Sequence, residues 1–238
     1  MQSSRWHAHG NVYLVHEGDS HGVDMSGTDG VIEILGVEGD DIEIAIVNPD
    51  GSHAEMSGNG TRIAAAWAME RTGSSAVRVH VGPRVVDVRT TEDGLYESDV
   101  GEVEVGETEI VDGIELTPVS VGNPHAVVVG DPAEIVRIGP LLETHARFPE
   151  RTNVQVVRID GPGEVTARVW ERGVGETTAS GSSAVAVAAA THPEGEVLVH
   201  FPGGDLRVTL EGGRARLTGP AEPVTEPPAS RQEADRSP

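Results

Sequence analysis

The chain has 238 residues and a formal net charge of −22, and it contains neither cysteine nor lysine. This length suits one large domain or two small ones, with ample room for a hydrophobic core. The charge argues against nucleic acid as a partner, because neutralising phosphates needs a basic face. The missing side chains exclude disulfides, thiolate catalysis, cysteine-ligated metal sites and Schiff-base chemistry, including that of pyridoxal phosphate.

The first part of the chain predicts short strands around one helix. Alternating or Val-rich segments between turn signals are typical of antiparallel strands joined by hairpins. They occupy Val12–His16, Gly30–Leu35, Ile42–Val47, Ala76–Val81, Val85–Thr90 and Val100–Val105. Gly60–Arg71 carries small residues nearly all round, which predicts a helix buried within the sheet. A polar, glycine-rich segment that begins at Asn48 delivers Ser57-Gly58 to the start of this helix.

The second part repeats this order. Its predicted strands are Ile114–Val121, His125–Val129, Asn153–Ile159, Glu164–Trp170, Glu196–Phe201 and Leu206–Glu211. A short helix is expected over Pro132–Thr144, with Asp131 as its N-cap. A second buried helix is expected over Gly181–Thr191. Another glycine-rich loop, starting at Glu171, delivers Ser180-Gly181 to this second helix.

The repeated order predicts an α+β fold of two similar halves, residues 1–112 and 113–219, each a mostly antiparallel sheet wrapped around a central helix. Residues 220–238 are rich in Pro, Glu and Ser and are expected to form a disordered tail. No signal peptide is visible, and no run reaches the roughly 18 apolar residues of a membrane span. A cytoplasmic protein without membrane contact is therefore expected.

The two Ser-Gly helix starts are the main candidate site. If both face one cleft, their free backbone N–H groups point at one anion, such as a carboxylate, with Ser57 and Ser180 on either side. Alternatively, each serine only caps its helix. Neither serine lies in the Gly-x-Ser-x-Gly motif of serine hydrolases.

Further polar residues allow two interpretations. Glu171 and Arg172 are either a surface charge pair or a carboxylate-binding arginine beside a glutamate that holds an amine or relays a proton. The Gly-Asn-Pro-His segment is either an ordinary turn or a device that places Asn123 as a ligand donor and His125 for proton transfer. The loop 149–153 similarly places Asn153.

The histidines near the N-terminus are His7, His9, His16 and His21. Their spacing is not that of a metal site, so no metal is expected.

Seven ordered motifs between about Trp6 and Gly219 resemble the diaminopimelate epimerase family of cofactor-independent amino-acid racemases. They are His9–Asn11, Gly27–Ile32, Asn48–Ser52, Met56–Arg62, Val121–His125, Pro149–Val154 and the segment Glu171–Gly181. The resemblance implies an amino-acid substrate between the halves, no cofactor and a homodimer. It also implies that polar side chains bind the substrate: Asn11, Asn48, Asn123, Asn153, Glu171 and Arg172. The backbone at Gly58-Asn59 and Gly181-Ser182 would hold the α-carboxylate, and His125 and Glu171 would assist the two proton-transfer residues.

In this family the two proton-transfer residues are cysteines, whereas this chain has Ser57 and Ser180. A free thiol has a pKa of about 8.5, which a helix N-terminus lowers further. A serine hydroxyl is a far weaker acid, so serine alone is poorly matched to proton transfer near neutral pH. Two smaller departures are Val12, where the family has Asp, and a segment before Gly27 that is too short for the helix expected there.

Three functions are consistent with these residues. The leading one is epimerisation of LL-diaminopimelate to the meso form, toward lysine and peptidoglycan. The second is a same-fold isomerase of the phenazine-biosynthesis type, with Glu171 or His125 as acid and base. The third is a non-catalytic amino-acid-binding or regulatory protein, in which Ser57 and Ser180 only cap helices.

Overall fold

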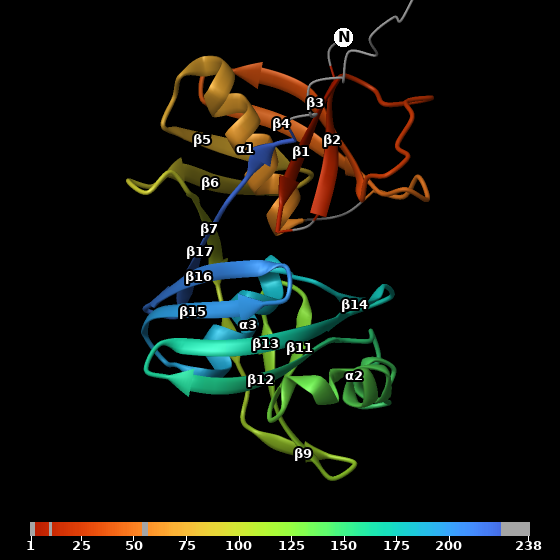
Figure 1. Cartoon of the computed structure of the whole chain (residues 1–238), viewed down its shortest axis with the longest axis vertical. Coiled ribbons are helices and arrows are strands. Elements are labelled where there is room, and N and C mark those ends of the chain that lie inside the picture. Colours follow the sequence, from red (N-terminus) through yellow and green to blue (C-terminus); the bar gives the residue numbers. More distant parts are fainter. Residues whose placement is uncertain (1–2, 10, 54–56, 225–238) are drawn as a thin grey trace, which may run out of the picture.

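The computed structural model describes residues 3–9, 11–53 and 57–224. Figure 1 shows two bodies stacked along the long axis, which are called here the first and second half. The first half contains β1 (Ser3–Ala8), β2 (Asn11–Glu17), β3 (Gly30–Glu38), β4 (Asp41–Val47), α1 (Gly58–Thr72), β5 (Ala76–Val81), β6 (Arg84–Thr90) and β7 (Tyr96–Glu102). The strands β8 (Glu104–Val105) and β9 (Glu109–Val111) follow.

The second half contains β10 (Ile114–Ser120), β11 (Pro124–Val129), a 3-10 turn η1 (Pro132–Glu134), α2 (Ile135–Glu143), β12 (Asn153–Gly161), β13 (Glu164–Glu171), β14 (Gly175–Thr177), α3 (Gly181–Thr191), β15 (Gly195–Phe201), β16 (Gly204–Glu211) and β17 (Arg214–Gly219). The last strand, β18 (Glu222–Pro223), lies in the first half. The predicted helix 132–144 is therefore a 3-10 turn followed by an α-helix. β1, β9, β14, β17 and β18 were not among the predicted strands, and the strand expected over 100–105 begins earlier, at Tyr96.

Both halves follow one topology. In each, a parallel pair (β2–β3 or β11–β12) leads into a hairpin (β3–β4 or β12–β13). The central helix then connects two further parallel strands, β4 to β5 through α1 and β13 to β15 through α3. Parallel neighbours need such a long crossover connection. Antiparallel pairs still predominate, so the prediction of a two-half α+β fold is confirmed. The expectation that hairpins join the strands holds only in part, because the parallel pairs are joined by longer connections.

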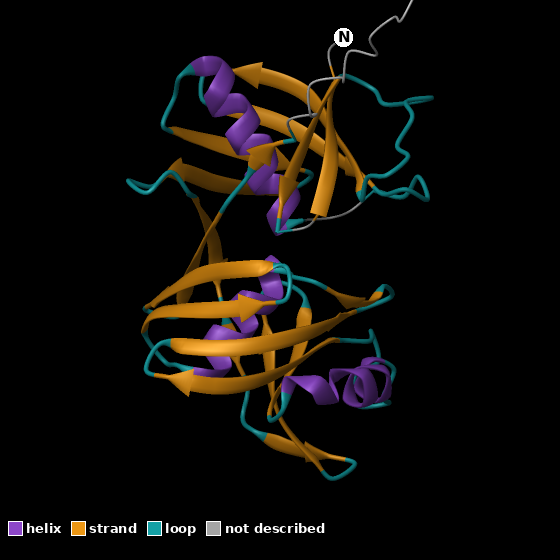
Figure 2. Ribbon diagram, in the orientation of Figure 1, coloured by secondary structure: helices purple, strands orange, loops and turns teal. Residues whose placement is uncertain are grey.

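The central helices are buried inside their sheets. Every residue of α1 from Asn59 to Met69 is buried, and so are Gly181 and the residues from Ser183 to Ala188 in α3. Figure 2 shows α1 and α3 each running alongside the strands of its own half, whereas α2 lies at the outside of the second half. Alanine allows this because it presents little volume to the Val and Ile side chains of the strands. Within the described residues, no helix is both long and apolar enough to cross a membrane.

The halves are joined by an exchange of chain segments. β7 and β17, the equivalent strands of the two halves, pair antiparallel with each other. After β7, the chain enters the second half, where β8 pairs with β10. After β17, it returns to the first half, where β18 pairs with β1. The predicted boundary between Asp112 and Gly113 falls inside the β9–β10 hairpin. Earlier in the chain, within β7, Tyr96 packs against the core of the first half and Val100 against that of the second.

The predicted start of the disordered tail at residue 220 is wrong. Ala221 is 4% exposed and belongs to the core of the first half, and Val224 N donates a hydrogen bond to Arg5 O. Small apolar side chains and backbone hydrogen bonds are sufficient to order residues 221–224, because the edge of β1 offers free backbone groups for pairing. Residues 225–238 of the predicted tail lie outside the described residues.

The loop between β2 and β3 is the main asymmetry between the halves. The equivalent connection in the second half carries α2, whereas residues 18–29 form turns and bends without a helix. This agrees with the prediction that the segment before Gly27 is too short for a helix.

Candidate active site

The N-terminal ends of α1 and α3 meet at the junction of the two halves (Figure 2). A Cβ atom placed on Gly58 would lie 3.6 Å from Gly181 Cα, and a Cβ on Gly181 would lie equally close to Gly58 Cα. The two helix starts therefore lie next to each other. The first backbone N–H groups of a helix have no acceptor within that helix, so two neighbouring helix starts are an arrangement suited to an anion.

The two serines have different partners. Ser57 Oγ accepts a hydrogen bond from Gly60 N at 3.0 Å, as an N-cap does, and lies 3.3 Å from the Tyr13 hydroxyl oxygen. Ser180 makes no side-chain cap hydrogen bond. Its hydroxyl instead hydrogen bonds to the Glu171 carboxylate and lowers the pKa of that group. The capping interpretation therefore describes Ser57 but not Ser180.

Glu171 ends β13 beside Ser180. Its Oε1 also accepts a hydrogen bond from Thr177 Oγ1 at 2.5 Å. Burial raises the pKa of Glu171 above its ordinary value, more than the hydrogen bonds from Thr177 and Ser180 lower it. The carboxylate is thus a stronger base than that of an exposed glutamate. Burial also raises the pKa of the Tyr13 hydroxyl, so that group stays protonated near neutral pH.

His125 lies behind the cleft and is 1% exposed. Its Nε2 lies 3.0 Å from Asn123 Oδ1, and its Nδ1 accepts from Gln155 Nε2 at 3.0 Å. Burial lowers the pKa of His125 to about 3, and the nearby charge of Arg172 acts in the same direction. The ring is therefore neutral, with its proton on Nε2 and donated to Asn123.

Asn153 connects this group to the second glycine-rich loop. Its Nδ2 donates to Pro124 O at 3.0 Å, and its Oδ1 accepts from Arg172 N at 3.0 Å. The parallel register of β11 and β12 places His125 beside Asn153. The backbone of Arg172 is thus positioned by Asn153, while its side chain is exposed and donates to Glu150 O at 3.2 Å.

A second network lies under the start of α1. Asn59 Nδ2 donates to Asn11 Oδ1 at 2.6 Å, and Arg62 Nη2 donates to Asn59 Oδ1 at 2.7 Å. Arg62 Nε donates to Pro220 O at 3.2 Å, which ties the returning chain to this helix. Arg62 is fully buried, and burial lowers its pKa to about 10. In the described part of the chain, no carboxylate forms an ion pair with it.

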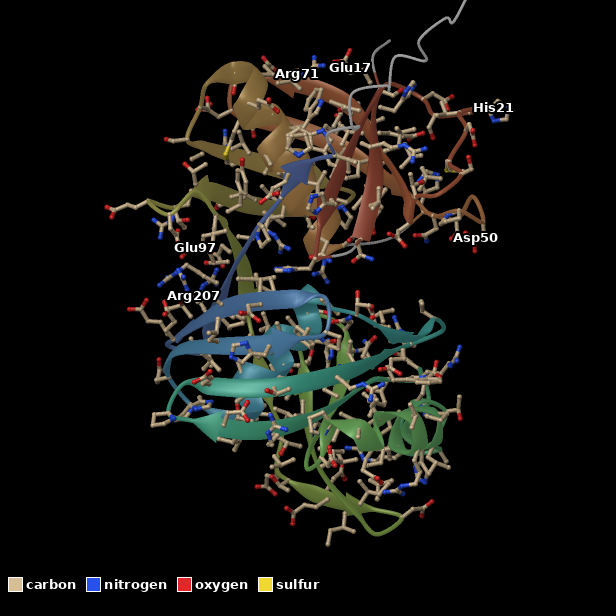
Figure 3. All side chains as sticks on the ribbon, in the orientation of Figure 1. Glu17, His21, Asp50, Arg71, Glu97 and Arg207 are labelled. Atoms are coloured by element: carbon tan, nitrogen blue, oxygen red, sulfur yellow. The ribbon has the colours of Figure 1, made fainter. Side chains whose placement is uncertain are left out.

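Asn48 lies apart from these networks. Its Nδ2 donates to Ser52 Oγ at 3.0 Å within its own turn, whose tip carries Asp50 (Figure 3). The residues between His53 and Ser57 that complete this loop lie outside the described residues.

The N-terminal histidines do not form a shared site. His7 Nε2 lies 3.8 Å from a Glu222 carboxylate oxygen, His16 contacts Ser3, and His21 projects from the 18–29 loop (Figure 3). Among the residues that the structure describes, no three His, Asp or Glu side chains are grouped as metal ligands.

A cavity of about 240 Å³ opens at the meeting point of the helices. Five predicted binding residues line it: Gly58, Asn123, Arg172, Gly181 and Ser182. The remaining lining residues were not predicted from the sequence: Thr61, Arg84, Val86, Ser98, Val100, Val121, Gly122 and Leu217. The other predicted residues are not part of its lining: Asn11, Asn48, Ser57, Asn59, His125, Asn153, Glu171 and Ser180. Tyr13 and Gln155 were missed because no sequence signal links them to Ser57 and His125, which lie 44 and 30 residues away in the chain. Thr177 lies within the segment Glu171–Gly181 but was not singled out from it.

Comparison with known proteins identifies the family. The family model described as diaminopimelate epimerase matches residues 19–106 and 117–224. The chain belongs to the diaminopimelate epimerase family. A curated diaminopimelate epimerase from Desulforudis audaxviator is 38% identical over 83% of this chain and 82% of its own length. One from Cupriavidus metallidurans is 31% identical and covers 95% of this chain and 96% of its own length.

Solved structures agree with this family's fold. An epimerase predicted in Pseudomonas aeruginosa superposes with a TM-score of 0.70 at 19% identity, over 94% of this chain and 96% of that one. A hydroxyproline epimerase from Agrobacterium vitis, solved with trans-4-hydroxy-L-proline, gives a TM-score of 0.66 at 16% identity, over 94% and 89% of the chains. At these identities the likeness concerns the fold alone.

Proposed function

We propose that this protein is a cofactor-independent isomerase that epimerises LL-diaminopimelate to meso-diaminopimelate by proton transfer on two faces of the α-carbon. The observation that carries the proposal is the pair of neighbouring helix starts with one serine hydroxyl on each. The named relatives in the diaminopimelate epimerase family support the choice of substrate. This reaction would serve the synthesis of lysine and peptidoglycan precursors.

The substrate would bind between the halves. Backbone N–H groups at Gly58-Asn59 and Gly181-Ser182 would hold the reacting α-carboxylate, because the first N–H groups of a helix have no acceptor within that helix. The remaining predicted binding residues would hold or position the ammonium groups and the far carboxylate: Asn11, Asn48, Asn123, Asn153, Glu171 and Arg172. Asn153 would act through the backbone of Arg172, since both polar atoms of its side chain already have protein partners.

Ser180 and Glu171 would act together as the base. In this step, Ser180 Oγ takes the α-proton while its own proton passes to the Glu171 carboxylate. The electron pair left by the broken C–H bond is delocalised into the α-carboxylate at the helix starts. The raised pKa of Glu171 brings this pair closer to the operating pH, which compensates in part for the weakly acidic serine hydroxyl.

Ser57 would act on the opposite face. Its hydroxyl gives a proton to the α-carbon, and the Gly60 N–H and the Tyr13 hydroxyl hold the oxygen left behind. The reverse reaction follows the same path with the proton positions exchanged. Serine on both faces therefore implies slower chemistry than a thiol pair would support.

We assign a positioning role to His125 in place of the predicted proton transfer. A ring with a pKa of about 3 is a weak base near neutral pH, and both ring nitrogens already have side-chain partners. This disfavours the alternative in which His125 is the acting base. Glu171 remains the strongest base beside the helix starts, but it would act through Ser180.

Location in the cytoplasm, a homodimeric state and independence from pyridoxal phosphate or any other cofactor remain predictions. Size-exclusion chromatography with light scattering tests the oligomeric state. Assays with purified, dialysed protein test the need for a cofactor.

Proton NMR in D₂O with LL-diaminopimelate tests the proposed function. We expect loss of the α-proton signal and formation of the meso isomer with the natural protein, and a strong loss of rate in Glu171→Gln. The matched control is Glu176→Gln, whose side chain pairs with Arg168 on the outer surface. Ligand-induced line broadening without exchange would support the binding-protein alternative and contradict the proposal. An unaffected Glu171→Gln variant would contradict the assigned base.

A further inference from the structure

The cavity at the helix starts has polar groups at both of its ends. At one end, Thr61 and Ser98 are 1% and 5% exposed, and their hydroxyl oxygens have no hydrogen-bond partner among the described residues. Thr61 belongs to the first turn of α1. Ser98 pairs with Leu217, whose Cδ2 atom lies directly beside Gly181. These unsatisfied hydroxyls therefore lie at the helix-start end and suit a polar ligand.

Arg84 lines the other end. Ser98 pairs with Val88 of β6, and Arg84 lies four residues before Val88 on the same face of that strand. At about 3.3 Å per residue, the Cα atoms of Arg84 and Val88 lie roughly 13 Å apart along β6. Valine side chains, including Val86 and Val100, line the cavity between the two ends. The cavity thus suits a molecule with a polar group at each end and an aliphatic middle.

The guanidinium of Arg84 crosses from the first half to the second. A Cβ placed on Gly122 would lie 2.6 Å from Arg84 Nη2 and 3.2 Å from Arg84 Cζ. Gly122 also has φ +81°, a left-handed conformation that disfavours other residues. Glycine at this position therefore lets the arginine lie against the turn that carries Asn123. Arg172, from the second half, lines the same cavity.

We propose that Arg84 forms a carboxylate subsite that binds the far carboxylate of the substrate, so that each half contributes one arginine to this end of the cavity. Guanidinium groups bind carboxylates through strong, charge-assisted hydrogen bonds. The subsite selects a substrate with two carboxylates over an amino acid with one. The inference rests on the proposed function, because it assumes that the reacting carboxylate occupies the helix starts.

Titration calorimetry separates this inference from the proposed function. The probes are diaminopimelate and lysine, which has the same carbon chain and amines but lacks the far carboxylate. We expect Arg84→Met to weaken diaminopimelate binding about 10- to 100-fold and to leave the weaker binding of lysine unchanged. Arg84→Lys should recover part of the loss. The control is Arg89→Met, on the same strand but paired with Glu97 on the outer surface.

Each outcome bears on the subsite. Selective loss of diaminopimelate affinity in Arg84→Met supports it, even if the natural protein shows no α-proton exchange and the proposed function fails. Equal losses for diaminopimelate and lysine would reduce Arg84 to a structural role and overturn the inference. Unchanged affinity of Arg84→Met for both diaminopimelate and lysine would also overturn the subsite. In that case, α-proton exchange by the natural protein would still support the proposed function. If the natural protein does not bind diaminopimelate, both proposals fail.

Discussion

Replacement of His125 by glutamine tests the neutral, buried imidazole behind the cleft. Burial lowers the pKa of His125 to about 3 in the folded protein, whereas an unfolded histidine titrates near the ordinary value of 6.5. Because the folded pKa is depressed, the unfolded state binds the extra proton first as the pH falls. The stability contributed by the neutral ring is therefore fully present above about pH 6.5 and is lost as the pH falls toward 3.

The size of the effect follows from these two values. Each pH unit below 6.5 favours the unfolded state by up to about 1.4 kcal/mol. Between pH 7 and pH 5, the natural protein should lose about 2 kcal/mol of its free energy of unfolding through His125 alone. A glutamine at position 125 can still hydrogen bond to neighbouring polar groups but does not titrate. The free energy of unfolding of the variant should therefore not show this pH-dependent loss.

Urea unfolding of the natural protein and of His125→Gln at pH 7 and pH 5 measures the difference. Glu171, whose raised pKa makes folding more favourable as the pH falls, is present in both proteins, so its effect cancels. His21→Gln is the matched control, because that side chain is exposed in a loop far from the cleft. If natural protein and His125→Gln lose stability in parallel between the two pH values, the buried neutral ring is refuted.

Two further predictions concern the helix starts. The double variant Ser57→Cys, Ser180→Cys should raise the rate of α-proton exchange in D₂O by about 10²-fold or more, because a thiol is better matched to neutral pH; no gain in a folded variant would contradict the proton-transfer roles of these positions. Gly181→Ala should cost about 1–3 kcal/mol of unfolding free energy by overpacking, since the new Cβ would lie 2.8 Å from Leu217 Cδ2. Gly58→Ala should cost less, because its Cβ meets only ordinary contacts at 3.6 and 3.8 Å; denaturant unfolding of both variants compares them, and equal losses would contradict this packing argument.

The sequence by itself determined the repeated plan of the fold. Small residues around 60–71 and 181–191 indicated helices buried on all sides, and Ser-Gly before each indicated a helix start. Val-rich segments with turn signals located most of the strands. These features depend on local chemistry, because helix starts, turns and hydrophobic periodicity are set by residues close in the chain. The ordered motifs added the family, which the comparisons confirm.

Only the tertiary structure decided which partners these residues have. Ser57 and Ser180 look alike in sequence, but one caps its helix beside Tyr13 and the other hydrogen bonds to Glu171. The conversion of the predicted tail into β18 depends on the open edge of β1, more than two hundred residues away in the chain. The depressed pKa of His125 similarly arises from burial between segments of the second half. Such properties depend on contacts between distant segments, so local sequence patterns carry no signal for them.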